Sequence, residues 1–398
     1  MTMSIDPPEE LARLAIIRDE LPAVKTAVYL NCGTAGPLPQ RVVEAMQAAL
    51  ADELEQGRIR PAVHEQVLQA REAARAALAR RLHCAPDEIA LTARTTDGMN
   101  IALWGLPLQP GDEVLTTRHE HPGLLVPLAA LASRRGVSVR YVDWPQEDPS
   151  LAAEALARAT TARTRLLAFS HVLWTNGARL PVERIAEQAH GASALVLVDG
   201  AQAAGAIPLD FSTLGADFYA LPGQKWLLGP EGTGAFYAAR DAQALCQPTF
   251  TGYLSTAGVD PFAPNYLPSA GARRYEVGSA LPAATIGQLE SLRWQEEMAP
   301  EDWALDRVAA LAQELRAALA ELRGVEVLTP AARAASGIVS FRVAGMAAPE
   351  ATKRLQGKGL LVRFLPAPHE AVRACTGFYV LREELKALRD AVGELAGA

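Results

Sequence analysis

Short apolar runs alternate with segments of helical periodicity between about residue 70 and residue 240. Strands that alternate with helices over this length favour βα units and a mainly parallel sheet that is covered on both faces. The predicted strands are 88–93, 113–118, 137–144, 165–172, 194–199, 217–221 and 234–238, and the predicted helices are 96–106, 123–135, 150–159 and 181–190.

The pattern changes after residue 249. Residues 249–282 are rich in Gly, Pro and Ser, and residues 284–323 are strongly helical. Shorter strand and helix patterns follow and predict a small α+β domain. Its predicted strands are 325–328, 337–343 and 360–364, and its predicted helices are 348–357 and 382–395.

We therefore expect three units along the chain. An N-terminal segment, residues 1–25, is expected to pack with the small domain. Residues 26–283 form the large domain, and residues 284–398 form the small C-terminal domain. We find no internal repeat and no low-complexity segment that would change this division.

Two ionisable residues carry the candidate chemistry. Asp199 ends the apolar run 194–198, and Lys225 follows 26 residues later in a loop rich in Gly and Pro. Alone, such an aspartate is often a helix N-cap, and such a lysine is often a solvated charge. Together they are the pair that pyridoxal 5'-phosphate (PLP) needs. The amine holds the cofactor aldehyde as a Schiff base, and the carboxylate keeps the pyridine nitrogen protonated.

Other polar residues fall at the same edge of the predicted sheet. In open α/β sheets, ligands bind beyond the carboxyl ends of the strands. We therefore expect one cleft to collect the residues that lie at or after those ends, namely His121, Ser170, His171, Asp199 and Lys225.

Composition narrows the classes of protein. The chain has 398 residues, of which 49% are hydrophobic and 21% are charged, as in ordinary globular proteins. The net charge of −7 gives no support for nucleic-acid binding. Cys32, Cys84, Cys246 and Cys375 have no metal-type spacing. With neither a signal-peptide pattern nor an uncharged run that could span a bilayer, we expect a cytoplasmic protein without a metal or a membrane partner.

Three segments carry a family resemblance: 199–202 (Asp-Gly-Ala-Gln), 223–225 (Gly-Gln-Lys) and 229–234 (Gly-Pro-Glu-Gly-Thr-Gly). They resemble the class V aminotransferase family of fold-type I PLP enzymes, which includes cysteine desulfurases, cystine C-S lyases and isopenicillin N epimerase-like proteins. The resemblance extends from Tyr29 to Val380. It implies an α/β fold, with a mainly parallel seven-stranded sheet in the large domain and a small C-terminal α+β domain.

The resemblance also implies roles in holding PLP. Thr95 and Thr96, at a strand-to-helix turn, would bind the phosphate together with helix N-terminal amides, although helix N-caps share this geometry. His121 would stack on the pyridine face. Gln202 would hydrogen-bond the ring oxygen, and Gln224 occupies the phosphate-binding position before the lysine.

Two further segments concern the partner subunit and the substrate. Residues 274–279 resemble a segment that reaches the phosphate of the neighbouring subunit, which implies a homodimer in which Ser279 completes the partner's site. Arg373 aligns with the arginine that binds the α-carboxylate of an amino acid substrate. A guanidinium suits this role because its two N–H groups bond both carboxylate oxygens.

The chain departs from the desulfurases near this arginine. Their mobile loop carries a nucleophilic cysteine, whereas residues 361–369 contain none. Arg363 stands there instead, ten residues before Arg373. The arginine pair resembles that of the cystine lyases and suits a substrate with two carboxylates, while a surface salt bridge is the other interpretation of Arg363. Tyr253 resembles part of an aromatic patch beside their active site.

Two other positions also differ from the family pattern. The usual asparagine near the ring oxygen falls at Trp174, so this contact is lost or shifts to Thr175 or Asn176. Pro222 replaces a common serine ligand of the phosphate.

The missing cysteine and the arginine pair predict a C-S lyase. We expect β-elimination from L-cystine or L-cysteine to give pyruvate and ammonia, with Lys225 removing the α-proton. Transamination to a keto acid, epimerisation and sulfoxide lysis within the same family are alternatives. A non-catalytic binding protein on this fold is another. A nicotinamide dehydrogenase is disfavoured because no GxGxxG follows an early strand.

Overall fold

The computed structural model describes residues 5–278, 280–331 and 336–397. Within these ranges, seven strands form the central sheet of the large domain, in the order β2-β8-β7-β6-β5-β3-β4. Strand β8 is antiparallel to both of its neighbours and the other pairs are parallel, so the mainly parallel sheet is confirmed. The strands are β2 (Ile89–Thr92), β3 (Glu113–Thr117), β4 (Ser138–Val142), β5 (Thr164–Ser170), β6 (Leu195–Asp199), β7 (Phe218–Pro222) and β8 (Gly234–Ala238).

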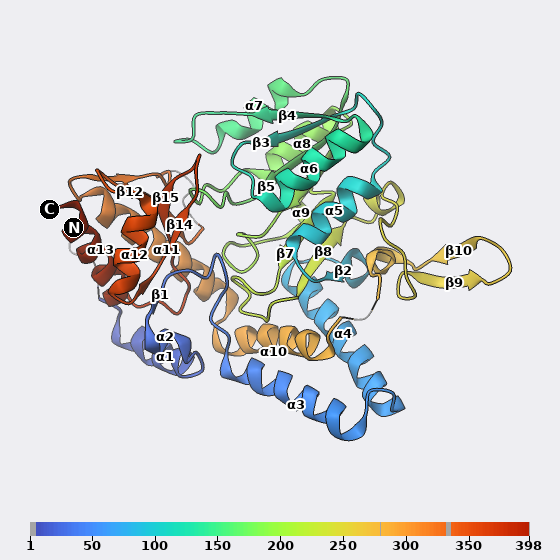
Figure 1. Ribbon diagram of the computed structural model, residues 1–398, viewed down its shortest axis with the longest axis horizontal. Helices are drawn as coiled ribbons and strands as arrows, with labels where there is room; N and C mark the ends of the chain where they lie inside the picture. Colours follow the sequence, from blue (N-terminus) through green and yellow to red (C-terminus); the bar gives the residue numbers. More distant parts are fainter. Residues whose placement is uncertain (1–4, 279, 332–335, 398) are drawn as a thin grey trace.

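The sheet is buried on both faces because its central strands are apolar at successive positions. In β5, Leu166 and Ala168 face one core, whereas Leu167 and Phe169 face the other. Helices cover each side of the sheet (Figure 1). Side chains of α5 (Thr95–Gly105) and α6 (Pro122–Arg135) pack into the first core, and those of α7 (Leu151–Ala159), α8 (Val182–Gly191) and α9 (Phe211–Leu214) pack into the second.

The smaller sheet is antiparallel and, in the part of the chain that is described, has the strand order β11-β12-β15-β14. The predicted strand 360–364 is divided at Val362. Its first half pairs with β1 (Val28–Tyr29), and its second half pairs with β15. The elements are β11 (Val325–Val327), β12 (Ile338–Val343), β13 (Leu360–Leu361), β14 (Arg363–Leu365), β15 (Ala371–Cys375), α11 (Glu301–Ala320), α12 (Ala348–Gly357) and α13 (Arg382–Ala396).

The predicted helical region 284–323 is two helices, because Pro300 precedes α11 as its N-cap. The first of them, α10 (Pro282–Met298), packs against α3 (Gln40–Gln56) and α4 (Pro61–Arg81), as Figure 1 shows. Arg41 of α3 forms an ion pair with Glu290 of α10 at 2.9 Å. The sequence patterns did not predict α3 and α4.

The N-terminal segment lies beside the small domain (Figure 1). Arg18 of α1 (Pro8–Asp19) forms an ion pair with Glu384 at 2.8 Å. Asp6 is buried and accepts hydrogen bonds from Arg307 at 2.9 Å and Arg382 at 2.7 Å. A short helix, α2 (Ala23–Thr26), then leads to β1. The domain boundaries at 25 and 283 stay predictions.

A β-hairpin projects from the large domain at the right of Figure 1. It consists of β9 (Thr256–Asp260) and β10 (Asn265–Pro268), which pair with each other in an antiparallel register. We call residues 256–268 the arm. None of the helices within the described residues is long and apolar enough to cross a membrane.

Candidate active site

One cavity of about 290 Å³ lies at the carboxyl ends of the large-domain strands, where the loops of the large domain meet β14 and β15. Most of the residues predicted from the sequence line it together, although they are scattered over 279 positions of the chain, from residue 95 to residue 373. These residues are Thr95, Thr96, His121, Asp199, Gln202, Gln224, Lys225, Arg363 and Arg373.

Asp199, a carboxylic acid, and Lys225, an amine, both line this cavity. Asp199 ends β6 and is buried, and its Oδ1 accepts the Ala201 amide at 2.8 Å. Burial raises the pKa of Asp199, while the Ala201 hydrogen bond and the charge of Lys225 oppose that rise. Burial lowers the pKa of Lys225 to about 8, helped by repulsion from Arg373 and opposed by Asp199. The amine is therefore nucleophilic near neutral pH, since a larger fraction is uncharged.

The loop that carries Lys225 approaches the chain closely at Gly36. The Gly36 amide donates to the Gln224 carbonyl at 2.7 Å. A Cβ at Gly36 would meet the Lys225 carbonyl oxygen at 2.3 Å, so a larger residue would displace the loop. Glycine at this position therefore allows the lysine to reach its place in the cavity.

The cavity also has the donors that a phosphate needs. Helix α5 begins at Thr95, and the extended residue Arg94 precedes it without a side-chain cap among the described contacts. The first-turn amides and the hydroxyls of Thr95 and Thr96 are thus available to an anion. Gln224 Oε1 is buried and has no hydrogen-bond partner in the described ranges. Rotation of this amide by 180° would turn its NH2 group toward an acceptor.

His121 and Gln202 also line the cavity. His121 is the N-cap of α6, and its Nδ1 accepts the Gly123 amide at 3.0 Å. Burial, followed by repulsion from Lys225, lowers the pKa of His121 to about 4. The imidazole is therefore neutral, as stacking on a cationic ring requires. Gln202 uses Oε1 to accept from Trp226 at 2.9 Å and one Nε2–H to donate to Gly33 at 2.7 Å, which leaves its second N–H for a ligand.

Two guanidinium groups close the cavity from the small domain. Arg363 Nη1 and Arg373 Nη2 donate to the same oxygen, Thr34 Oγ1, at 3.0 and 3.2 Å. Arg373 is 1% exposed, and its Nε is buried without an acceptor among the described residues. Burial and the charge of Arg373 lower the pKa of Arg363. Two neighbouring cations with unused donors favour an anionic ligand.

Comparison with known proteins identifies the family. The model of the family "Aminotransferase class-V" matches residues 28–388. This chain belongs to the class V aminotransferase family. It is 32% identical over 391 residues to the isopenicillin N epimerase of Streptomyces clavuligerus, covering 94% of this chain and 96% of the relative. It is 29% identical to a probable cysteine desulfurase of Methanothermobacter thermautotrophicus, covering 96% and 98% of the two chains.

Solved structures of this family confirm the fold. The cystine C-S lyase C-DES in complex with its reaction product, cysteine persulfide, matches with a TM-score of 0.89 and 30% identity, covering 94% of this chain and 99% of that chain. A lysine-to-alanine variant of C-DES with glycine covalently linked to PLP matches with a TM-score of 0.90 and 30% identity, covering 95% and 99%.

The family is PLP-dependent, and PLP is the cofactor of this class V enzyme. The described residues fit the group. Lys225 offers a nucleophilic amine to the aldehyde, and Asp199 offers a buried carboxylate to the pyridine nitrogen. The uncapped start of α5 and the unpaired Gln224 amide suit the phosphate.

Thr34 is the main cavity residue that the sequence analysis missed. It follows the short strand β1 in the polar turn 31–34, and its hydroxyl donates to Asn31 Oδ1 at 2.8 Å. The cluster of Asn, Gly and Thr after an apolar strand is the signal that could have drawn attention to it. Thr34 accepts hydrogen bonds from two arginines that are more than 300 residues away in the chain, and a local sequence pattern cannot predict such a contact.

Four of the predicted residues that the structure describes do not line this cavity, namely Ser170, His171, Thr175 and Tyr253. The expectation that one cleft would also collect Ser170 and His171 is therefore wrong, because Ser170 Oγ donates to Glu120 Oε2 at 2.5 Å and His171 Nδ1 lies 3.1 Å from the Tyr219 hydroxyl oxygen.

Thr175 Oγ1 lies 2.9 Å from His119 Nδ1, while Trp174 takes the wall position beside His121, with ring centroids 5.2 Å apart. Tyr253 is 66% exposed outside the cavity. Ser279 lies outside the described residues. No group of three or more His, Cys, Asp or Glu residues suited to a metal ion is present in the described part of the chain.

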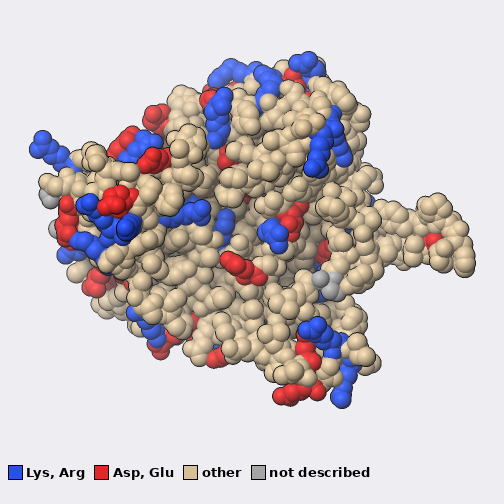
Figure 2. Space-filling model, in the orientation of Figure 1, with Lys and Arg blue, Asp and Glu red and all other residues tan. Residues whose placement is uncertain are grey.

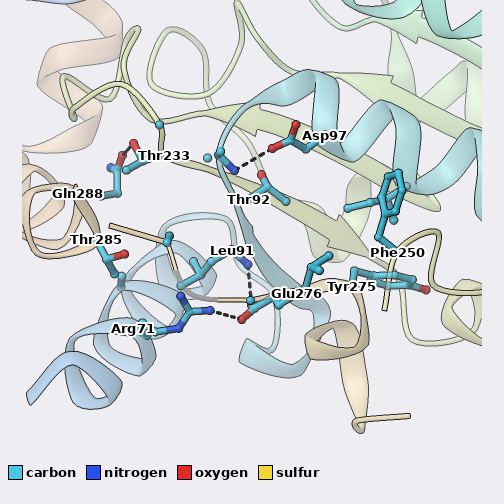
Figure 3. A pocket seen from close by; sticks show the side chains of 18 of the residues that line it. Arg71, Leu91, Thr92, Asp97, Thr233, Phe250, Tyr275, Glu276, Thr285 and Gln288 are labelled. Carbon is cyan, nitrogen blue, oxygen red and sulfur yellow. Dashed lines mark hydrogen bonds and ion pairs between the residues drawn. The ribbon is translucent and has the colours of Figure 1, made fainter. Parts of the chain in front are cut away.

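A second, more apolar cavity of about 590 Å³ lies beside the same turn, 92–97 (Figure 3). Glu276 connects two other lining residues, since its carboxylate accepts hydrogen bonds from Arg71 at 2.6 Å and from the Leu91 amide at 2.8 Å. Phe250 and Tyr275 lie at one side of the cavity, and Thr233, Thr285 and Gln288 lie at the other (Figure 3). The cavity thus adjoins the segment that leads to residue 279.

Proposed function

We propose that this class V enzyme is a C-S lyase that eliminates sulfur from an L-cystine-type amino acid. The observation that carries the proposal is the pair Arg363 and Arg373, whose guanidinium groups line one cavity with Lys225. A substrate with a carboxylate at each end matches two cations better than a substrate with one. The C-DES structures, which come from a cystine C-S lyase, support the same activity by similarity.

The positions of the thiols also support a lyase over a cysteine desulfurase. A desulfurase needs a nucleophilic cysteine that reaches the substrate sulfur. Cys32, Cys246 and Cys375 are buried, and Cys84 lies at a separate cavity beside Phe211. No cysteine of this chain is among the described lining residues of the active site. The sulfur is therefore expected to leave with the product.

Each residue then has a defined task. Arg373 binds the α-carboxylate, and Arg363 binds the distal carboxylate. When bound, PLP supplies an electron sink next to the substrate Cα. Asp199 holds the proton on the pyridine nitrogen, and the Lys225 amine takes the proton from Cα. Cleavage of the Cβ–S bond of cystine releases cysteine persulfide, and the three-carbon remainder is hydrolysed to pyruvate and ammonia.

The test is pyruvate formation by the PLP-loaded protein with L-cystine or L-cysteine and no keto acid. We expect release of pyruvate and ammonia in equal amounts, and no release by Lys225→Ala. No pyruvate from either substrate would refute the lyase. Turnover that begins only when a keto acid is added would indicate an aminotransferase. Appearance of the D configuration at Cα, with exchange of the Cα hydrogen in deuterated water and without pyruvate, would indicate an epimerase, the activity named for the Streptomyces relative.

We also propose that the enzyme is a homodimer in which Ser279 completes the partner's phosphate site. The surface of the arm supports a second copy of this chain as partner. The arm contains a single charged residue, Asp260, and Figure 2 shows it projecting with almost no charge. A two-stranded hairpin is at best marginally stable alone in water. Its exposed apolar side chains therefore require a partner surface. They are Val259, Phe262, Tyr266 and Leu267.

A second copy of this chain is the partner that the surface suits. The apolar cavity of Figure 3 is lined in part by residues 249–250 and 275–278, which flank the arm on both sides in the chain, so a two-fold axis could present arm and cavity to a second copy. Gly252, close to the base of the arm, is so near Val277 that an added Cβ would meet the Val277 carbonyl oxygen at 2.1 Å. The chain at the base of the arm is therefore in close contact with the segment that precedes Ser279.

A further inference from the structure

Glu120 is a buried acid that the proposed reaction leaves without a role. It is 2% exposed and immediately precedes His121. Its Oε1 accepts from Thr117 Oγ1 at 2.6 Å, and its Oε2 accepts from Ser170 Oγ at 2.5 Å. Both hydroxyl partners are buried as well. Burying a carboxyl group in the interior costs free energy, and only its hydrogen bonds offset that cost. A buried acid with no part in the reaction is therefore a candidate for a structural task at the site.

The hydrogen bonds of Glu120 join two strand ends. Thr117 ends β3, and its Oγ1 also accepts a hydrogen bond from the His119 amide at 3.1 Å. This local hydrogen bond stabilises the turn before His121. Ser170 ends β5 and is the register partner of Asp199 at the end of β6. Glu120 therefore ties the turn that carries His121 to the strand ends beside Asp199.

We propose that Glu120 is a positioning residue that, as an uncharged acid, holds His121 at the cofactor site and leaves Asp199 as the anion that would face the pyridine nitrogen. The inference rests on the proposed PLP site and is independent of whether the reaction is elimination, transamination or epimerisation. A neutral acid can donate its own proton to one hydroxyl and accept from the other, so both bonds to β3 and β5 are retained.

The electrostatics agree with this arrangement. Burial, with added repulsion from Asp199, raises the pKa of Glu120 to about 8, although the hydroxyl groups oppose the rise. The other ionisable groups nearby have partners of their own. Arg118 pairs with Asp143, and His119 bonds Thr175. His171, on the β5 side, bonds Tyr219.

The experiment compares Glu120→Gln and Glu120→Ala in the PLP-loaded protein. Gln is neutral at every pH and can keep both hydroxyl bonds, whereas Ala removes them. We expect Glu120→Gln to retain the cofactor dissociation constant within about threefold. Glu120→Ala should weaken cofactor binding by about tenfold or more and lower kcat by about 100-fold, because a small misplacement of reacting groups has an effect of that size.

The pH dependence separates positioning from simple packing. In the wild-type protein, ionisation of Glu120 above pH 8 places a second anion beside Asp199. The absorbance of the bound cofactor and the thermal unfolding temperature should therefore change there. Glu120→Gln should lack this alkaline step. Since the folded protein keeps a proton that the unfolded chain loses, the wild-type protein should also lose stability relative to Glu120→Gln as pH rises from about 4.5 to about 8.

Glu113→Gln is the matched control. Glu113 is at the other end of β3, is 1% exposed, and also accepts from a hydroxyl group, Thr161 Oγ1, at 2.8 Å. Its replacement should reduce stability without changing the cofactor spectrum or its pH dependence. The inference is overturned if Glu120→Gln weakens cofactor binding as much as Glu120→Ala does, or if it keeps the alkaline step. Should Glu120→Ala fail to fold, the comparison of Glu120→Gln with the wild-type protein decides.

Discussion

Arg363 and Arg373 lie directly opposite each other on the adjacent antiparallel strands β14 and β15. Opposite residues of such a pair point to the same face of the sheet, and like charges there are destabilising. The chain nevertheless places both guanidinium groups on one hydroxyl, that of Thr34. Repulsion between the two guanidinium groups raises the free energy of the protein without a ligand, and a bound anion would reduce that repulsion.

Replacement of Arg363 by Gln should reduce activity in a substrate-dependent way. A charge-assisted hydrogen bond contributes about 1.5–3 kcal/mol, which corresponds to about 10- to 160-fold in kcat/KM for L-cystine. An amino acid with one carboxylate should lose less than about threefold. Steady-state kinetics with both substrates measure this ratio. Arg342→Gln, on the exposed face of β12, is the control. Equal losses for the two substrates would contradict a distal-carboxylate role.

Replacement of Thr34 by Val should raise KM for the dicarboxylate substrate, while Thr34→Ser should not. Val keeps the shape of the side chain but removes the hydroxyl group that accepts from both arginines. Without that acceptor the two cations are free to separate, and the carboxylate-binding geometry is lost. The KM values of the two variants for L-cystine provide the comparison. A Ser variant as poor as the Val variant would show that packing, and not the hydroxyl group, is what matters.

Capture of PLP by the cofactor-free chain should depend on pH through Lys225. The pKa of this amine is lowered from an ordinary 10.5 to about 8, so the uncharged fraction rises tenfold per pH unit below pH 8 and levels off above it. The rate of the absorbance change on mixing with PLP measures the dependence. A midpoint near 10.5 would mean that the lysine is not buried beside other cations. Lys225→Ala should show no covalent capture after borohydride reduction.

Much of the fold and of the active site could be predicted because it is encoded locally. The apolar run before Asp199 predicted β6, and the end of a parallel strand predicted where its carboxylate would lie. His121 and Thr95 follow the same logic, since each begins a helix directly after a strand. One cavity collects these residues because all of those strands end at one edge of the sheet.

The remainder depends on contacts between distant segments. Thr175 was expected near the cofactor, but the structure pairs it with His119, whose position is fixed by the other domain through the ring of His369, 4.7 Å away. Helix α4 mixes Ala, Val and Leu with charged residues and shows little periodicity. Its buried arginines, Arg71 and Arg75, both pair with Glu276, which lies 205 and 201 residues further along the chain, and no local pattern predicts that contact.

That ion network should be a large contributor to stability. Glu276 is 5% exposed and accepts from Arg71 and Arg75 at 2.6 Å each. Removing one partner of a buried ion pair costs about 3–5 kcal/mol because a charge is left uncompensated. Glu276→Gln should therefore lower the free energy of unfolding in urea by that amount. Glu350→Gln, which removes an exposed pair with Arg354, is the control and should have no measurable effect.

The same network predicts the direction of a pH effect. Although burial alone would raise it, the pKa of Glu276 is lowered overall, since hydrogen bonds and charges from Arg75 and Arg71 outweigh the burial. A carboxyl with a depressed folded-state pKa contributes stability that is fully present above its unfolded value and is lost as pH falls through the folded value. The difference in unfolding free energy between wild type and Glu276→Gln should thus shrink below about pH 4.5. A constant difference down to pH 3 would contradict this assignment.

The arm should control assembly. Phe262 at its tip is 97% exposed, and a carboxylate there could not be buried against a second subunit without a large desolvation cost. Phe262→Asp should therefore shift the protein from dimer toward monomer in light scattering at micromolar concentration. Because Ser279 is proposed to act across the interface, the variant should also bind PLP more weakly.

Ile59→Asp is the matched control for this prediction, since Ile59 is 95% exposed in the turn between α3 and α4, outside the arm. If Phe262→Asp remains dimeric with unchanged PLP affinity, the arm is not part of the dimer interface. If it becomes monomeric yet keeps PLP affinity, the interface is real but Ser279 does not complete the partner's site.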